Sequence, residues 1–264
     1  MITLKDKITW VTGASSGIGE ALAKELNNQG AKVIISARRK EELERVKADC
    51  AHPDMVAILV LDLIEISSFE AKVQEAMSFF GTVHILFNNG GISQRSMALE
   101  TPLSVDRRIM EIDYFGTIAL TKCVLPFMLK KQSGHVVTTS SLVGKFGSPW
   151  RSSYAAAKHA LHGFFDSIRT ELYEDNIKFT MVCPGFINTA ISINALAADG
   201  KPTGEMDNAQ ANGMSAQDCA RKIIEATKAE KLEVVIGGTE RFGVLLKRFL
   251  PRVFAKVIRK QNVR

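Results

Sequence analysis

The sequence has few cysteines, and none is placed as a metal site or a disulfide framework would require. The four are Cys50, Cys123, Cys183 and Cys219. They form no CxxC or CxxH pattern, and a scattered set of this kind is typical of a reducing compartment. We therefore expect no metal, no disulfide bonds and a cytoplasmic location.

Long apolar runs and leader-like segments are also absent. No window of about 18 uninterrupted apolar residues occurs, so we expect no transmembrane helix. The first residues, MITLKDKITW, enter a strand-like run directly and do not resemble a secretory signal. Because linkers, repeats and low-complexity segments are missing as well, we expect one domain over residues 1–240.

The excess of positive charge lies at one end of the chain. The protein has 264 residues and a net charge of +6, yet no acidic residue follows Glu240. The bases after it are Arg241, Lys247, Arg248, Arg252, Lys256, Arg259, Lys260 and Arg264. Subtracting these eight from +6 leaves −2 for residues 1–240. We expect no nucleic-acid partner, because the bases are confined to one segment and base-stacking aromatics are lacking elsewhere.

Residues 241–264, the C-terminal tail, also carry apolar side chains at helical spacing. These are Phe242, Leu245, Leu246, Phe249, Leu250, Val253, Phe254, Val257 and Ile258. A broad apolar face on a basic helix is typical of contact with a membrane surface, and it also suits a hydrophobic substrate entrance. We favour the alternative, a helix packed on the domain or on a partner subunit with its bases in solvent. Pro251 should kink this helix or divide it into two.

Short apolar runs alternate with longer amphipathic segments along most of the chain. The runs cover residues 8–13, 32–38, 56–62, 84–89, 135–141, 179–185 and 233–238. They lack period-two alternation, so they predict strands covered on both faces. Seven such strands separated by helices predict an α/β fold, a doubly wound parallel sheet of the Rossmann type in three αβα layers. The long unpatterned segment at about 190–214 is a candidate wall or lid of a substrate pocket.

A glycine-rich turn follows the first predicted strand. Residues 12–19 read TGASSGIG and open the first predicted helix. The three glycines allow a tight turn, close approach of the backbone to phosphate and close packing of helix on strand. The N–H groups at the helix start then face the phosphates of a dinucleotide. A plain structural turn is the alternative, but a strand before and a helix after favour nucleotide binding.

The spacing of these glycines resembles the TGxxxGxG pattern of the short-chain dehydrogenase/reductase family, and other family motifs follow in order. Asp62 ends the third predicted strand, NNGG at 88–91 resembles NNAG, and PGFINT at 184–189 resembles PGxxxT. Within the family, NNGGISQRS and YAAAKHALHGFFDSIRTEL most resemble the branch of 11β-hydroxysteroid dehydrogenase and membrane-associated carbonyl reductases. The resemblance implies cofactor contacts at Gly13, Ser15, Ser16, Gly17, Ile18, Gly19, Asp62, Leu63, Asn88, Asn89, Gly90, Tyr154, Lys158, Pro184, Gly185, Ile187 and Thr189.

The end of the second predicted strand favours NADP(H). An NAD-dependent enzyme holds the ribose 2′-hydroxyl there with an acid, whereas a basic residue accommodates a 2′-phosphate. This chain reads SARRK, with Ala37 at the place of the acid and Arg38 and Arg39 after it. An arginine can meet a phosphate with two parallel donors, so we expect Arg38 to be the main contact. Two solvated arginines at the start of a helix are the alternative.

The stretch YAAAK, residues 154–158, places Tyr154 and Lys158 on one helix face, as in many ordinary helices. Ser141 lies thirteen residues before Tyr154, which is the family spacing. Hydride reduction of a ketone leaves an alkoxide that needs a proton, and a nearby ammonium favours the phenolate of a tyrosine. The resemblance implies that Tyr154 is the general acid/base, Lys158 its electrostatic tuner and ribose clamp, and Ser141 the residue that orients the carbonyl. Ser140 would point the other way and serve structure.

One catalytic position departs from the family pattern. The stretch MEIDYFGTIAL places Asp113 where the family carries a catalytic asparagine that is thought to bend the helix and position a water. An aspartate accepts hydrogen bonds but lacks the donors of the amide, and its charge would oppose phenolate formation. We expect activity to survive with a shifted pH profile. Gly90 in place of the usual alanine should affect packing only.

These observations predict an NADP(H)-dependent oxidoreductase that interconverts a ketone or aldehyde and an alcohol on a lipophilic substrate. Two alternatives are a catalytically weak nucleotide-binding sensor or scaffold, which Asp113 favours, and a peripheral membrane protein that acts through its tail. The resemblance also implies a homodimer or homotetramer. The substrate itself is not specified by any motif.

Overall fold

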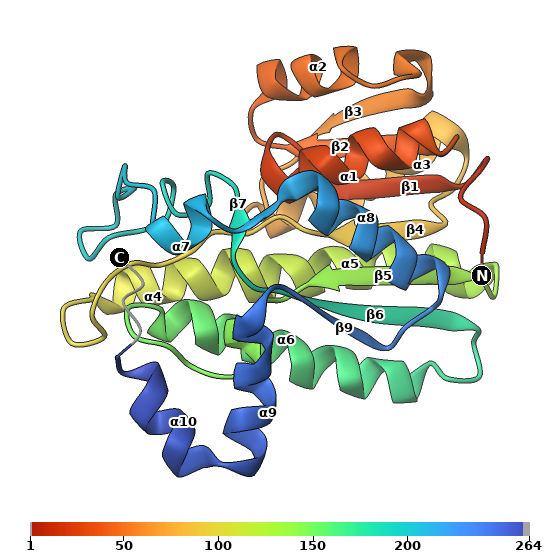
Figure 1. The fold of residues 1–264 in the computed structure, drawn as a ribbon. Helices are drawn as coiled ribbons and strands as arrows, with labels where there is room; N and C mark the ends of the chain where they lie inside the picture. Colours follow the sequence, from red (N-terminus) through yellow and green to blue (C-terminus); the bar gives the residue numbers. More distant parts are fainter. Residues whose placement is uncertain (1, 261–264) are drawn as a thin grey trace.

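Seven parallel strands form the central sheet, which Figure 1 shows with helices on both faces. The computed structural model describes residues 2–260; Met1 and residues 261–264, which include the tail base Arg264, lie outside the described residues. The strands are β1 (Ile8–Thr12), β2 (Lys32–Ala37), β3 (Val56–Val60), β4 (Ile85–Asn88), β5 (Gly134–Thr139), β6 (Ile177–Pro184) and β9 (Glu233–Ile236). Their order is β3-β2-β1-β4-β5-β6-β9, so the predicted doubly wound sheet is confirmed.

The strands form where the sequence places continuous apolar runs. All five residues of β1 are buried, and Trp10 at its centre donates its indole N–H to the hydroxyl of Ser36 at 2.7 Å. Because both faces of each central strand meet helices, side chains pointing either way must be apolar or hydrogen-bonded. This requirement explains why the strand boundaries could be read to within two residues or so.

Two apolar layers join the sheet to its helices. One contains Leu22 and Leu26 of α1 together with side chains from α2 and α8, and the other is built from α3, α5 and α6 around residues such as Phe69 and Phe165. The helices are α1 (Gly17–Asn28), α2 (Lys40–Ala48), α3 (Phe69–Phe80), α4 (Leu103–Met110), α5 (Thr117–Lys130), α6 (Ser152–Glu171), α7 (Asn208–Ala211), α8 (Ala216–Lys228), α9 (Phe242–Phe249) and α10 (Pro251–Ile258). The three-layer αβα prediction is confirmed.

The helices α4 and α5 run together through a π-helical segment, η3 (Glu111–Gly116). A π-segment inside a helix often marks a functional position. The combined stretch Leu103–Lys130 is long and apolar enough to cross a membrane by length and composition, with a mean hydropathy of 1.4. This is weak evidence for a span, because a core helix meets the same test and half of the apolar window is buried in the fold.

Two regions stand outside the regular alternation. The segment 190–214 follows β7 (Ile187–Asn188), contains α7 and ends at β8 (Met214–Ser215), which pairs with β7. The tail forms α9 and α10, divided at Pro251, and projects from the body of the fold in Figure 1. The ring of Phe254 packs edge-on against Phe146 with 5.1 Å between ring centres, which fastens the tail to the body.

Candidate active site

A large cavity of about 1270 Å³ lies at the carboxyl ends of the strands. Strand order reverses between β1 and β4, and ligands of doubly wound folds bind at this switch point. A cavity of this size exceeds the roughly 300–1,000 Å³ of an ordinary small-ligand pocket. It therefore has room for a dinucleotide and a second molecule.

The glycine-rich turn between β1 and α1 forms one wall. Gly13 and Gly17 have positive φ angles of 66° and 59°, a conformation that favours glycine. A Cβ on Gly19 would collide with the carbonyl of Gly13, so this third glycine permits close packing of the helix on the turn and does not itself line the cavity. Gly13, Ser15, Ser16, Gly17 and Ile18 all line it. The turn leaves an open backbone cradle at a helix start, which fits a dinucleotide phosphate.

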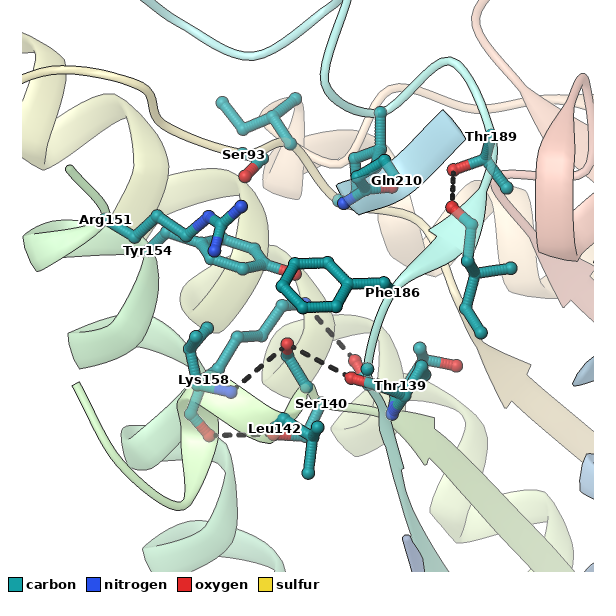
Figure 2. A pocket seen from close by; sticks show the side chains of 18 of the residues that line it. Ser93, Thr139, Ser140, Leu142, Arg151, Tyr154, Lys158, Phe186, Thr189 and Gln210 are labelled. Carbon is teal, nitrogen blue, oxygen red and sulfur yellow. Dashed lines mark hydrogen bonds between the residues drawn. The ribbon is translucent and has the colours of Figure 1, made fainter. Parts of the chain in front are cut away.

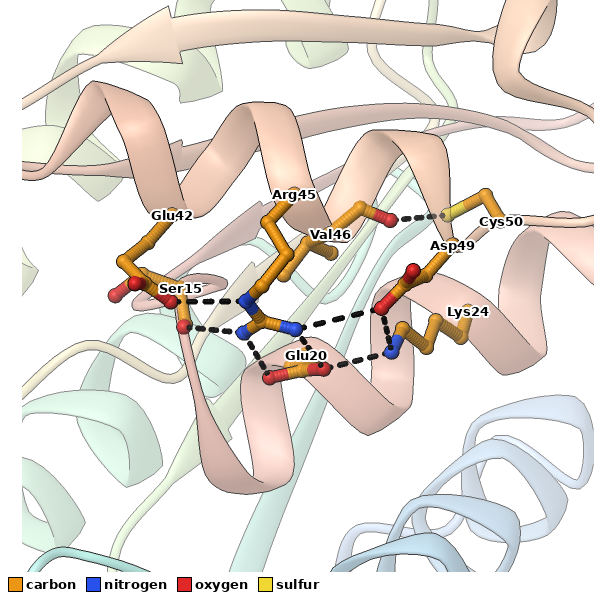
Figure 3. A network of polar contacts seen from close by, with 8 residues as sticks. All are labelled: Ser15, Glu20, Lys24, Glu42, Arg45, Val46, Asp49 and Cys50. Carbon is orange, nitrogen blue, oxygen red and sulfur yellow. Dashed lines mark hydrogen bonds and ion pairs between the residues drawn. The ribbon is translucent and has the colours of Figure 1, made fainter.

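The turn is fixed on its outer side by a network of charged groups between α1 and α2 (Figure 3). Arg45 donates to both carboxylate oxygens of Glu20, at 2.8 and 2.9 Å, and its guanidinium also reaches the carbonyl of Ser15. Lys24 donates to Glu20 at 2.7 Å. The hydrogen bond from Arg45 lowers the pKa of Glu20 to about 2. No motif indicated this network, because its members become neighbours only when α2 packs on α1.

The ends of β3 and β4 form the next part of the wall. Asp62 lies two residues beyond β3, lines the cavity with Leu63, and accepts a hydrogen bond from the N–H of Ile64. Asn89 and Gly90 are held by Thr12, whose hydroxyl accepts from both of their N–H groups at 3.0 Å. A Cβ on Gly90 would meet the tip of the Leu63 side chain at 2.8 Å, which agrees with the expected packing effect.

Asn88 does not reach the cavity. It is buried in β4 and donates to the hydroxyl of Thr121 at 2.9 Å and toward that of Thr138 at 3.4 Å. These contacts tie the strand to α5 and β5. Any effect of Asn88 on a cofactor is therefore indirect, through the position of the strand end.

Arg38 and Arg39 are exposed at the rim beside Ala37 and line the cavity. Neither side chain has a hydrogen-bonding or ion-pair partner among residues 2–260. Two unpaired guanidinium groups at the end of β2 leave positive charge where the ribose of a dinucleotide would lie.

The loop after β6 forms a further part of the wall, next to the glycine turn. Pro184, Gly185, Ile187 and Thr189 line it, and the methyl group of Thr189 would lie 3.1 Å from a Cβ on Gly17. The N–H of Phe186 donates to the carboxylate of Glu240 at 3.2 Å. The loop and the turn are therefore direct neighbours at this edge of the cavity.

Tyr154 and Lys158 lie in the first half of α6 and face the cavity, as Figure 2 shows. Both are buried, and the Lys158 ammonium is 5.6 Å from the centre of the Tyr154 ring. Lys158 also donates to the carbonyl of Thr139 at 3.2 Å. Ser141 lies just beyond β5 and lines the same cavity. Ser140 is buried and donates to the carbonyl of Lys158 at 3.1 Å, which agrees with its expected structural role.

Asp113 lies behind the lysine, in the π-helical segment. Its Oδ2 is 3.3 Å from the Lys158 ammonium, and its Oδ1 accepts the N–H of Ile92 at 2.8 Å. Burial raises the pKa of Asp113, although Lys158 opposes this effect. Burial acts to lower the pKa of Lys158, but the charges of Asp113 and Tyr154 outweigh it and leave the pKa raised. Lys158 is therefore held as a cation, in direct contact with the carboxylate that replaces the family asparagine.

Gln94 is a positioning residue that no motif indicated. Its side-chain oxygen accepts the N–H of Ser153 at 2.8 Å and that of Tyr154 at 3.3 Å. Both N–H groups lie at the start of α6, where a helix offers them no acceptor of its own. The N-cap residue Arg151 provides no side-chain cap. In the sequence, the lack of a capping side chain before α6 was the only sign that these N–H groups need an acceptor from elsewhere in the fold. It did not indicate which residue would supply that acceptor.

One group of side chains among residues 2–260 could hold a metal ion. It contains His162, Cys183 and Glu233, whose ligand atoms lie within 4.8 Å of one another. Lys145 already pairs with Glu233 at 2.8 Å, and burial raises the pKa of the Cys183 thiol. None of the three lines the cavity, and the expected absence of a metal stays a prediction.

Comparison with known proteins identifies close relatives. Residues 7–199 match the short chain dehydrogenase family. A mosquito protein, "Dehydrogenase/reductase SDR family protein 7-like" of Anopheles gambiae, is 45% identical and covers 98% of this chain and 84% of its own. The mouse protein "Dehydrogenase/reductase SDR family member 7B" is 37% identical and covers 97% of this chain and 81% of its own.

Solved structures agree in fold. A short-chain dehydrogenase from Streptomyces avermitilis has a TM-score of 0.80 at 28% identity and covers 96% of both chains. A short chain dehydrogenase/reductase from Burkholderia phymatum, solved in complex with NAD, has a TM-score of 0.85 at 21% identity, with 100% of this chain and 98% of its own covered. The chain therefore belongs to the short-chain dehydrogenase/reductase family of nicotinamide-dependent oxidoreductases.

Proposed function

We propose that the protein interconverts a ketone or aldehyde and an alcohol, with Ser141, Tyr154 and Lys158 as its catalytic residues. The observation that carries the proposal is that these three groups line the same cavity as the phosphate cradle of the glycine turn. A bound nicotinamide would supply or accept the hydride. Tyr154 would donate the proton to the carbonyl oxygen, Ser141 would hold that oxygen by a hydrogen bond, and the Lys158 cation would favour the phenolate.

Turnover of a panel of ketones with NADPH tests this proposal. The intact chain should consume NADPH, and Tyr154→Phe should lower kcat by about 10² to 10⁴, because it removes the transferable proton and little else. The matched control is Tyr173→Phe, since Tyr173 is 78% exposed and lies outside the cavity. If NADPH binds but no ketone or alcohol is turned over, the sensor alternative that Asp113 favours is correct.

We also propose that the cofactor is NADP(H), held at its 2′-phosphate by Arg38 with Arg39 beside it. The unpaired guanidinium groups next to Ala37 support this choice. The Burkholderia relative was solved with NAD, so the preference has to be measured directly on this chain. A fluorescence titration should give tighter binding of NADPH than of NADH. Arg38→Ala should remove about 10-fold or more of that preference, whereas Arg107→Ala, on the exposed side of α4, should keep it.

A lipophilic substrate is the third part of the proposal. Beyond Tyr154 the cavity continues past Leu142 and Phe146 to the tail, where Leu246 and Phe254 line it. These side chains pack into one apolar cluster between the body and the tail. An apolar wall of this kind suits the hydrocarbon part of a substrate.

The exposed face of the tail supports peripheral contact with an anionic membrane. Its exposed apolar residues are Phe242, Leu245, Phe249, Leu250, Val253 and Val257. The basic residues alongside them give charge complementarity to anionic lipids. The full chain should co-sediment with anionic vesicles, and a Phe249→Asp, Val253→Asp variant should remain in the supernatant.

The matched control is Leu232→Asp, which alters an exposed leucine outside the tail. If wild-type protein stays in the supernatant but changes oligomeric state in the double variant, the tail is a subunit interface of the expected homodimer or homotetramer. The proposed location is the cytoplasm, at a membrane surface. No nucleic-acid partner is proposed.

A further inference from the structure

Two buried arginines beside the candidate catalytic tyrosine share one carboxylate. Arg95 donates to Oδ2 of Asp207 at 2.9 Å, and Arg151 donates to the same atom at 3.1 Å. Both arginines line the cavity, whereas Asp207 lies behind them. Figure 2 shows the Arg151 guanidinium facing the space occupied by Tyr154 and Phe186, and its Cζ is 5.9 Å from the centre of the Phe186 ring.

The pair carries more positive charge than its partner neutralises. The side chains of Arg95 and Arg151 are 9% and 6% exposed, so water screens neither charge well. The Nε of Arg95 is buried and has no hydrogen-bond partner in the described part of the chain. Burial, with repulsion from Arg95, lowers the pKa of Arg151 to about 10, although Asp207 and Tyr154 act in the opposite direction. One carboxylate for two buried guanidinium groups leaves a net positive charge that a second anion would balance.

A purely structural role, in which the ion pairs act as a clasp that holds the segment 190–214 to the body, would explain only part of this arrangement. Oδ1 of Asp207 accepts the N–H of Gln210 and caps α7, so the aspartate does fasten the segment 190–214 to the body. One arginine is sufficient for that contact. Arg95 also donates to the hydroxyl of Ser93 at 3.0 Å and to the carbonyl of Gln94 at 2.8 Å. Arg151, which faces the cavity, has Asp207 as its only hydrogen-bond acceptor among residues 2–260, so its burial carries a cost that a bound anion would offset.

We propose that the carbonyl substrate carries an anionic oxygen group, a carboxylate or a phosphate, which Arg151 and Arg95 bind beside the reacting carbon. This inference rests on the proposed oxidoreductase function and specifies its substrate class. The apolar part of the molecule would extend along Leu142 and Phe146 toward the tail. The substrate is therefore an amphiphile, with its charged end near Tyr154 and its hydrocarbon end near the surface that the tail exposes.

A comparison of matched substrates tests the proposal. A medium-chain keto acid and its methyl ester differ in charge but little in shape, and a keto alcohol phosphate can be paired with the corresponding acetate. With NADPH at saturation, kcat/KM should be about 10- to 100-fold higher for the charged member of at least one pair, because charged hydrogen bonds form only with that member. The carboxylate pair and the phosphate pair separately show which anion is bound.

Variants identify the arginine as the source of the preference. Arg151→Met should raise KM for the anion far more than for the neutral partner and bring their kcat/KM ratio close to one. Arg151→Lys should restore part of the ratio, since it keeps the charge. Asp207→Asn should increase the ratio, because it removes the competing carboxylate while keeping an oxygen to cap α7. The matched control, Arg107→Met, is an exposed arginine of α4 outside the cavity and should leave the ratio unchanged.

The possible failures are distinguishable. If the wild-type protein reduces the neutral ketones as well as the charged ones, the substrate class is wrong and the oxidoreductase function stands. If Arg151→Met lowers both members of a pair equally, the arginine is only a clasp and the inference fails. If no ketone of either kind is turned over, the proposed function itself fails.

Discussion

The cofactor side and the substrate side of the cavity are built in different ways. The cofactor side consists of strand ends and tight turns, where a hydroxyl such as that of Thr12 holds neighbouring backbone groups. The substrate side consists of side chains that meet across long distances in the sequence. Arg95 and Asp207 are separated by 112 residues, and Gln94 and Ser153 by 59. Backbone geometry fixes the first side, and buried polar side chains fix the second.

This difference predicts unequal sensitivity to loss of a single side chain. On the cofactor side, charged residues reinforce the turn from the solvent, where each ion pair adds little. On the substrate side, the polar side chains are largely buried, and few other groups could take over their hydrogen bonds. The loss of one side chain therefore leaves its partners unsatisfied. Substitutions at matched positions on the two sides can therefore test this difference.

The largest effect is expected from Gln94→Ala. It removes the acceptor for Ser153 and Tyr154 and the donor to the hydroxyl groups of Ser96, Thr101 and Ser152. The free energy of unfolding should fall by about 1–3 kcal/mol for the buried groups left unpaired. kcat should also fall, because the start of α6 positions Tyr154.

Urea denaturation and steady-state kinetics measure these two effects. Gln217→Ala is the matched control, since Gln217 is exposed on α8, and it should change stability by about 0.5 kcal/mol or less. Equal stability losses for the two variants would show that the substrate side is no more sensitive than an exposed surface.

The same contrast explains how far the sequence could be interpreted. Apolar runs predicted the seven strands, and the glycine turn, Ser141, Tyr154 and Lys158 were predicted because their motifs and separations resemble those of the family. Gly13, Gly17, Ser141, Tyr154 and Lys158 all line the cavity, whereas Gly19 does not. Gln94, Arg95 and Asp207 carried no such spacing. Their partners are chosen by the packing of segments that are distant in the chain, and the same is true of the network around Glu20.

Asp113 lies between the two sides, and Asp113→Asn should have an intermediate effect. Asparagine keeps an oxygen for the N–H of Ile92 but removes the negative charge that raises the pKa of Lys158. With that charge gone, the phenolate of Tyr154 becomes easier to form. The limb of the pH–rate profile that reports proton transfer should therefore move to lower pH.

The matched control is Glu111→Gln, which changes an exposed acid on the same helical segment. Its pH–rate profile should coincide with that of the wild-type protein. Unchanged rates for Asp113→Asn at every pH would show that the departure from the family asparagine is neutral.

The smallest effect is expected from Glu20→Gln, on the cofactor side. The pKa of Glu20 is lowered to about 2 by Arg45, so folding favours the ionised form. This stabilisation is fully present above the ordinary pKa of 4.5 and is lost as the pH falls toward 2. Because its partners Lys24 and Arg45 are 33% and 44% exposed, solvent screens the network and its contribution should be about 1 kcal/mol or less. In urea titrations between pH 7 and about pH 3, the variant should be slightly less stable at neutral pH and should lose less stability on acidification.

Glu70→Gln, at an exposed glutamate of α3, should reproduce the wild-type slope. A Glu20→Gln loss as large as that of Gln94→Ala would mean that the charged network supports the turn as strongly as the buried side chains support α6, and the proposed difference between the two sides would be wrong.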